Sequence, residues 1–121
     1  MILARALAEE GGNGKADNEL AGTLWRLRLM DFLLNRDLYV PSIDAWIDPA
    51  EPKARAIITH GHADHARAGH GAVLATPDTI EIMKVRYGED CAGRFQALDF
   101  GVVLDIDGTE VTFVPAGHIL G

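Results

Sequence analysis

The chain has 121 residues, within the size range of one small domain, and 48% of them are hydrophobic. This apolar content excludes a disordered chain, and no apolar run approaches the roughly 20 residues that cross a bilayer, so we expect no membrane partner. A single cysteine, Cys91, excludes an internal disulfide and favours a cytoplasmic location. The net charge is −7, but residues 51–98 hold six basic and six acidic side chains, so no basic nucleic-acid-binding surface is indicated.

The N-terminal third gives weak structural signals. Residues 1–19 are Gly-rich and lack apolar periodicity, which predicts a flexible leader. Residues 20–34 combine a helical stripe of apolar residues with a stretch that alternates like a strand. We favour a helix there and keep the strand as the alternative.

From Asp37 onward, short apolar runs are separated by turn residues. These runs predict strands at residues 38–40, 45–47, 54–59 and 72–75. The third of them, Ala-Arg-Ala-Ile-Ile-Thr, has the continuous apolar character of a buried strand. A helix should follow, because Thr76 is a good N-cap, Pro77 suits the first helical position and Gly88 ends the element.

The last elements form a predicted hairpin. Residues 102–106 and 110–114 alternate in hydrophobicity around Asp107-Gly108, the strongest short hairpin signal available. Strands interspersed with helices predict an α/β or α+β fold.

Potential metal ligands are concentrated directly after the predicted buried strand. Residues 60–65 read His-Gly-His-Ala-Asp-His, and imidazole and carboxylate are ligands of zinc and similar divalent ions. With one residue between them, His60 and His62 point to the same side of an extended backbone, and Gly61 provides freedom to bring them onto one ion. Asp64 and His65 fall at the expected start of a short helix and suit a second ion.

A fifth candidate, His118, follows the last predicted strand and would complete three-histidine coordination of the first ion. The alternative for the cluster is a zinc site with a purely structural role. Such sites are usually rich in cysteine, however, and Cys91 is remote from the cluster in sequence. For the isolated His70 a structural role is favoured over a functional one.

Two segments of the sequence resemble a known family. Residues 60–65 resemble the His-x-His-x-Asp-His signature of the metallo-β-lactamase superfamily. Residues 115–121, Pro-Ala-Gly-His-Ile-Leu-Gly, resemble the third motif of its β-CASP-type nuclease branch, which includes Artemis-like exonucleases and ribonuclease J. Residues 38–121 read throughout like the N-terminal part of the bacterial ligase-associated DNA exonucleases, also described as mRNA 3′-end processing factor-like.

The resemblance implies a role for each matching residue. His60, His62 and His118 would hold a first metal ion, and Asp64 and His65 a second. Asp64 would also act catalytically by orienting or deprotonating a water molecule. Asp48, at the end of a predicted strand, matches an aspartate that supports the metal-binding loop without ligating.

The resemblance also implies that the chain is incomplete. In the family a bridging aspartate, a later histidine and a cap domain that holds nucleic acid follow the third motif, and this sequence ends before them. We therefore expect a leader at residues 1–31 and a truncated metallo-β-lactamase-like domain at residues 32–121. That domain would be the N-terminal half of an αββα sandwich.

The implied function is metal-dependent phosphodiester hydrolysis of the DNA exonuclease type, in end processing or repair and with a functional link to a DNA ligase. Two divalent ions are the implied cofactors, zinc being favoured and manganese the alternative. DNA is the preferred partner and RNA the alternative. Two other functions remain open, a thioester or lactam hydrolase of the same superfamily and an inactive metal-binding fragment. The chain by itself is expected to bind one metal weakly and to show little nuclease activity.

Overall fold

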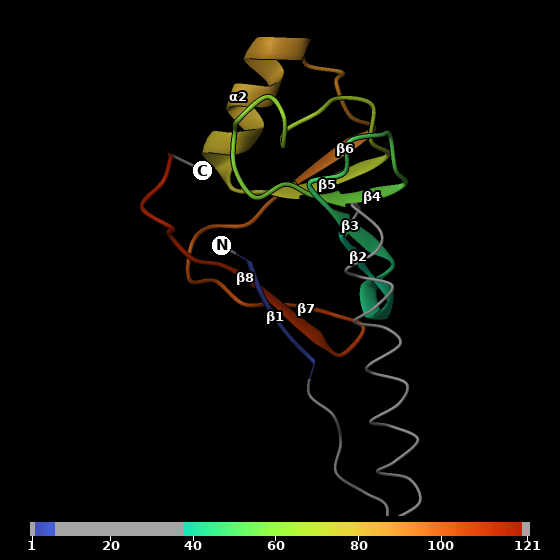
Figure 1. Cartoon of the computed structure of the whole chain (residues 1–121), viewed down its shortest axis with the longest axis vertical. Coiled ribbons are helices and arrows are strands. Elements are labelled where there is room, and N and C mark those ends of the chain that lie inside the picture. Colours follow the sequence, from blue (N-terminus) through green and yellow to red (C-terminus); the bar gives the residue numbers. More distant parts are fainter. Residues whose placement is uncertain (1, 7–37, 120–121) are drawn as a thin grey trace, which may run out of the picture.

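The computed structural model describes residues 2–6 and 38–119, which form one α-helix and two β-sheets in three layers (Figure 1). The five-stranded sheet contains, in spatial order, β2 (Leu38–Val40), β3 (Ala45–Ile47), β4 (Arg55–Ile57), β5 (Ala72–Ala75) and β6 (Arg94–Ala97). The three-stranded sheet contains β1 (Ile2–Ala6), β8 (Thr109–Phe113) and β7 (Leu104–Ile106), also in spatial order. A 3₁₀ turn, η1 (Pro41–Ile43), connects β2 to β3.

Strand direction in the larger sheet determines where the functional loops lie. Strands β3, β4, β5 and β6 are parallel, and β2 is an antiparallel edge strand beside β3. Trp46 of β3 is in register with Ala56 of β4, so both strands end at the same edge of the sheet. The residues that follow them are thereby brought together, as ligand-binding loops are in open parallel sheets.

Both faces of the larger sheet are covered, which explains the continuous apolar character of its central strands. Helix α2 (Pro77–Tyr87) packs on one face, and the three-stranded sheet packs on the other (Figure 1). The core on the helix side consists of Ala56, Ile58, Ala66, Val73, Ala75, Ile80, Met83 and Cys91. The core between the sheets consists of Ile43, Ala45, Ile57, Leu74, Leu98, Val111 and Phe113.

Local sequence signals correctly predicted α2 and the hairpin. The Thr76 side chain accepts a hydrogen bond from the backbone N–H of Thr79 at 3.4 Å, and the helix ends at Gly88, whose φ is +99°. Asp107 and Gly108 both have positive φ, as a two-residue turn between twisted strands requires. The mixed α and β character of the fold is likewise as expected.

Some expectations about the elements were wrong. Residues 2–6 form β1 within the predicted leader, because they pair with β8 from the other end of the sequence. Strand β6 was not predicted, since its four residues are too short a run to define a strand by themselves and its pairing with β5 defines it. Asp64 and His65 lie in a hydrogen-bonded turn, with His65 N–H donating to the His62 carbonyl, and not in a helix.

Three further outcomes concern boundaries. Strand β4 is shorter than the predicted run at residues 54–59, because the chain leaves the ladder toward Asp48. The hairpin strands are Leu104–Ile106 and Thr109–Phe113, each displaced slightly from the expected bounds. The helix expected at residues 20–34 lies outside the described residues. Within the described part of the chain, no helix is long and apolar enough to cross a membrane.

Candidate metal centre

The candidate site lies where three chain segments meet at one edge of the larger sheet. Asp48 follows β3, the His60–His65 loop follows β4, and His118 comes from the segment after β8. Gly117 has a φ of +67°, so the backbone turns sharply just before His118. The site is thus assembled from strand ends that the two packed sheets place together.

One group of potential ligands contains His60, His62 and His118. One nitrogen of each ring lies within 4.8 Å of the corresponding nitrogen of the other two. Nε2 of His60 and Nδ1 of His62 are 3.0 Å apart. Two imidazole nitrogens bound to one tetrahedral zinc ion, each at about 2.0–2.1 Å, are separated by about 3.3 Å. The pair therefore needs very little movement to share an ion.

Asp48 joins the loop to the sheet through three hydrogen bonds. Its Oδ1 accepts from the backbone N–H of Thr59 at 2.7 Å, and its Oδ2 accepts from the Thr59 hydroxyl at 2.5 Å. Nδ1 of His65 lies 2.9 Å from the same Oδ2. Asp48 has a φ of +46°, a conformation that aspartate tolerates better than most residues. Its carboxylate therefore fixes both ends of the loop.

These hydrogen bonds also determine the tautomers of two histidines. The single hydroxyl proton of Thr59 is donated to Asp48, so Thr59 Oγ1 must accept from Nδ1–H of His60, 2.8 Å away. Nδ1 of His65 likewise carries the proton that it donates to Asp48. In the neutral ring Nε2 of His60 is consequently an acceptor, and it receives a hydrogen bond from Nδ1–H of His62, 3.0 Å away. In a neutral His65 ring Nε2 likewise carries the lone pair. Outer hydrogen bonds of this kind orient histidine ligands in metal sites.

A second group of potential ligands contains Asp48, His60 and His65. The ring centroids of His60 and His65 are 4.2 Å apart. Asp64 belongs to neither group, but its Oδ2 lies 3.6 Å from Nε2 of His65, close enough for both atoms to bind one ion. The Asp64 side chain is 76% exposed, so it can move toward an ion without losing buried contacts.

Helix α2 holds the loop from behind at Gly61. This glycine is buried, and a Cβ built on it would lie 2.7 Å from Cδ1 of Ile82. One turn further along α2, Arg86 donates a hydrogen bond of 2.9 Å from its guanidinium to the Gly61 carbonyl. The expected role of Gly61 was backbone freedom, but its φ is not positive. A glycine fits there because a larger residue would displace the Ile82 side chain of the closely packed helix.

The environment of His60 favours its neutral form. Burial lowers the pKa of His60 first, and the neighbouring His65, His62 and His118 lower it further when they are charged, whereas Asp48 opposes the shift. A neutral imidazole is the form that binds metal ions.

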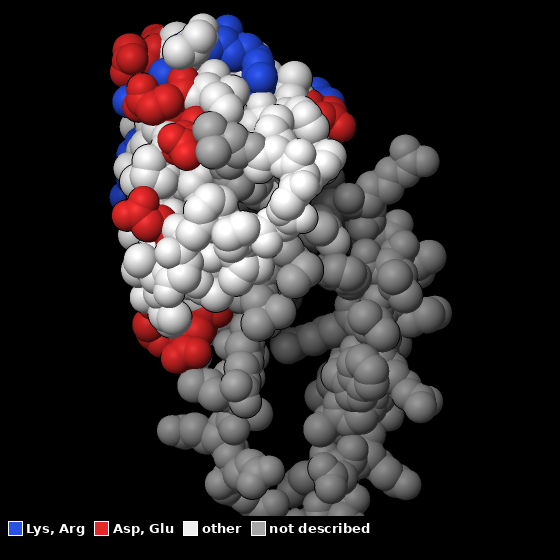
Figure 2. Space-filling view, turned by 90° about the vertical axis from the view of Figure 1, so that its left-hand side faces the viewer, with Lys and Arg blue, Asp and Glu red and all other residues white. Residues whose placement is uncertain are grey.

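The molecular surface on the side of the chain's C-terminal segment has uncharged residues at the centre of its described part (Figure 2). Lys and Arg gather at its upper edge in this view.

His70 has the structural role that was favoured for it. Only 1% of the residue is exposed, and its Nδ1 accepts a hydrogen bond of 3.2 Å from the backbone N–H of Lys53. Its Nε2 is buried without a hydrogen-bond partner among the described residues. His70 thus connects the chain before β4 to the chain before β5 and takes no part in either ligand group.

The structure brings together five of the six predicted site residues in the two ligand groups, and it places Asp64 at their margin. Sequence reasoning missed Thr59, Ile82 and Arg86. The position of Thr59 beside His60 was a usable signal, but the contacts of α2 join residues about 20 positions apart and leave no local pattern.

No family model, curated protein or solved structure matches the chain, so the chemistry of the site must be inferred from its side chains.

Proposed function

We propose that this chain is a divalent-metal-binding hydrolase of the metallo-β-lactamase superfamily, acting on phosphodiester bonds in DNA as an exonuclease. In this proposal the three layers are the N-terminal part of an αββα sandwich. The observation that carries the proposal is the hydrogen-bond network from Asp48 through Thr59 to His60, together with its branch to His65. It places the lone pair of the neutral rings on Nε2 of His60 and Nε2 of His65.

The donor set supports a first ion better than a second. His60, His62 and His118 offer three nitrogens, a set typical of catalytic zinc sites that keep a position open. A neighbouring ion would have His65 and Asp64 among the described residues, with Asp48 engaged in hydrogen bonds to the loop. We therefore expect this chain to bind one zinc or manganese ion weakly and a second ion more weakly still.

Bound divalent ions would lower the pKa of a water molecule toward about 7 and offset the charge that develops on a phosphate. The chain's own residues contribute positioning and proton transfer. Exposed Asp64 lies beside His65 and can orient a water molecule or take its proton. The face shown in Figure 2 has uncharged residues at the centre of its described part, so the attraction for a polyanion would come mainly from the ions.

Metal-dependent release of nucleotides from end-labelled linear DNA tests this function. With excess zinc or manganese we expect slow hydrolysis that a chelator stops and that Asp64→Asn reduces about 100-fold or more. Lys84→Gln is the matched control, because Lys84 lies on α2 and contacts Glu81 and Glu89 instead of the loop. Activity that is equal in Asp64→Asn and in the unchanged chain would contradict the assigned role of Asp64.

The same assay should include RNA, a glutathione thioester and nitrocefin. The proposal predicts that linear DNA is hydrolysed fastest. Faster turnover of RNA would reassign the substrate to the alternative nucleic acid, and faster turnover of the thioester or lactam would contradict phosphodiester chemistry. Metal binding without hydrolysis of any of the four would instead support a metal-binding fragment.

A further inference from the structure

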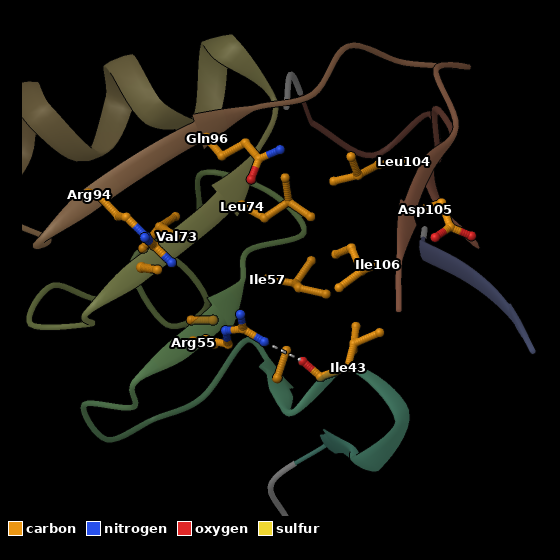
Figure 3. A pocket seen from close by; sticks show the side chains of 13 residues that line it. Ile43, Arg55, Ile57, Val73, Leu74, Arg94, Gln96, Leu104, Asp105 and Ile106 are labelled. Atoms are coloured by element: carbon orange, nitrogen blue, oxygen red, sulfur yellow. Dashed lines mark hydrogen bonds between the residues drawn. The ribbon is translucent and has the colours of Figure 1, made fainter. Parts of the chain in front are cut away.

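A concave region lies between the two sheets, and its lining contains none of the candidate metal ligands. It is a cavity of about 230 Å³, lined by residues of β3, β4, β5, β6 and β7 and by Ile43 of η1 (Figure 3). Apolar side chains form most of its walls, among them Ile57, Leu74, Leu104 and Ile106. An apolar cavity of about 150 Å³ holds benzene, so this one has room for a larger organic molecule.

One end of the cavity carries two arginines at matched positions. Arg55 is the first residue of β4 and is paired with Ala72 of β5, which in turn is paired with Arg94, the first residue of β6. Residues in register on parallel strands project from the same face, and strands are about 4.8 Å apart. The small Ala72 therefore leaves a gap between two long cationic side chains that start about 10 Å from each other.

The residues two positions further along these strands show which face of the larger sheet the two arginines project from. Ile57, Leu74 and Gln96 follow the arginine row by two positions on their strands, so they share its face. Ile57 and Leu74 belong to the core between the sheets. The arginines thus stand at the entrance to an apolar space, with the Gln96 amide as a further polar group inside it (Figure 3).

Neither arginine is neutralised within residues 2–6 and 38–119. Arg55 donates one hydrogen bond of 3.1 Å to the carbonyl of Ile43 and has no carboxylate partner there. The Arg94 backbone N–H donates to the Gly71 carbonyl at 3.0 Å, but its guanidinium makes no hydrogen bond or ion pair in that part of the chain. The acidic residue of the cavity, Asp105, lies at its far side and accepts a hydrogen bond from Gly108 in the turn (Figure 3).

The geometry points to a binding site for a small organic carboxylate with an apolar body larger than benzene. Its carboxylate would lie between Arg55 and Arg94, where a guanidinium can donate two parallel hydrogen bonds, and its apolar part would enter the space beside Ile57 and Leu74. Arg55 and Arg94 are the first residues of their strands, whereas Asp48 and His60 come after the last residues of theirs. The two sites therefore lie at opposite ends of the parallel strands. Binding here is therefore independent of metal.

Titration of the chain with octanoate, followed by NMR of the methyl groups, tests the inference. We expect saturable shifts concentrated on Ile57, Leu74, Leu104 and Ile106, with and without chelator. Octanol, which has the same apolar body and no charge, should bind at least about tenfold more weakly. Equal affinity for octanol, shifts at other methyl groups or no saturable binding in the millimolar range would each overturn the inference.

Substitutions identify the residues responsible. Arg94→Gln should weaken octanoate binding about tenfold, and because Arg94 is exposed and makes no contact that the fold needs, the variant should fold normally. Ala72→Leu tests the gap between the arginines independently and should prevent binding by filling it. Lys84→Gln removes the same charge from the far face of the sheet and should leave affinity unchanged. Unchanged affinity in both Arg94→Gln and Ala72→Leu would refute the assignment.

Discussion

Replacing Thr59 with valine removes one hydroxyl group from the network behind the candidate metal centre. The hydroxyl donates to Asp48 Oδ2 and accepts from Nδ1–H of His60 at 2.8 Å. Valine has the same shape, and the hydrogen bonds from the Thr59 backbone N–H and from His65 to Asp48 remain possible in the variant. The substitution therefore releases the tautomer and orientation of His60 while leaving the loop anchored.

The size of the effect follows from that geometry. Loss of an outer-shell partner of a histidine ligand weakens metal binding by about 10–100-fold. This corresponds to about 1.4–2.8 kcal/mol of binding free energy, at about 1.4 kcal/mol for each factor of ten. Without metal, Thr59→Val should lower the free energy of unfolding by about 1–2 kcal/mol, because a hydrogen bond to a carboxylate is lost.

Competition with a coloured chelator measures the zinc affinity of both proteins, and denaturant titration measures their stability. The matched control is Thr112→Val, because the Thr112 hydroxyl is buried and has no hydrogen-bond partner in the part of the chain that the structure describes. That variant should keep its zinc affinity and lose no stability. An unchanged zinc affinity in Thr59→Val, or an equal loss in Thr112→Val, would refute the tautomer reasoning.

Three further predictions concern Gly61, Arg86 and His70. Gly61→Ala should lower the free energy of unfolding by about 1–3 kcal/mol in denaturant titrations, because its Cβ would meet Ile82, and adding Ile82→Ala should restore part of the loss. Arg86→Gln should weaken zinc binding about threefold to tenfold by freeing the Gly61 carbonyl, whereas Lys84→Gln should not, and equal affinities would contradict this. Burial lowers the pKa of His70 below its ordinary 6.5, so the unfolded chain binds that proton more readily. The contribution of His70 to the free energy of unfolding should be fully present above pH 6.5 and should be lost as the pH falls below it. The free energy of unfolding, measured from pH 7.5 to 5, should therefore decrease less in His70→Asn than in the unchanged chain.

The elements that could be predicted from sequence are those that local chemistry defines. Thr76, Pro77 and Gly88 bound α2, and Asp107-Gly108 forms the turn between β7 and β8. The elements that were missed depend on distant partners. β1 exists through pairing with β8, and β6 through pairing with β5, so neither has a strong pattern of its own.

The candidate site likewise combines features that local sequence spacing predicts with contacts that depend on distant residues. The spacing of histidines in residues 60–65 placed His60 and His62 on one side of the loop, and the structure brings their ring nitrogens together. The residues that hold this loop could not be found from spacing. Arg86 and Ile82 reach Gly61 from α2, and the steric reason for a glycine appears only once the helix is packed against the loop.

The most direct test of the proposed metal centre is a zinc titration followed by long-range proton–nitrogen NMR of the imidazole rings. Coordination should change the nitrogen shifts of His60 Nε2 and His62 Nδ1, with a further change at His118, while Nδ1 of His60 stays protonated against Thr59. The buried ring of His70 should not respond. Zinc-induced shifts confined to His70, or the absence of shifts at His60 and His62, would contradict the assignment of this loop as a metal site.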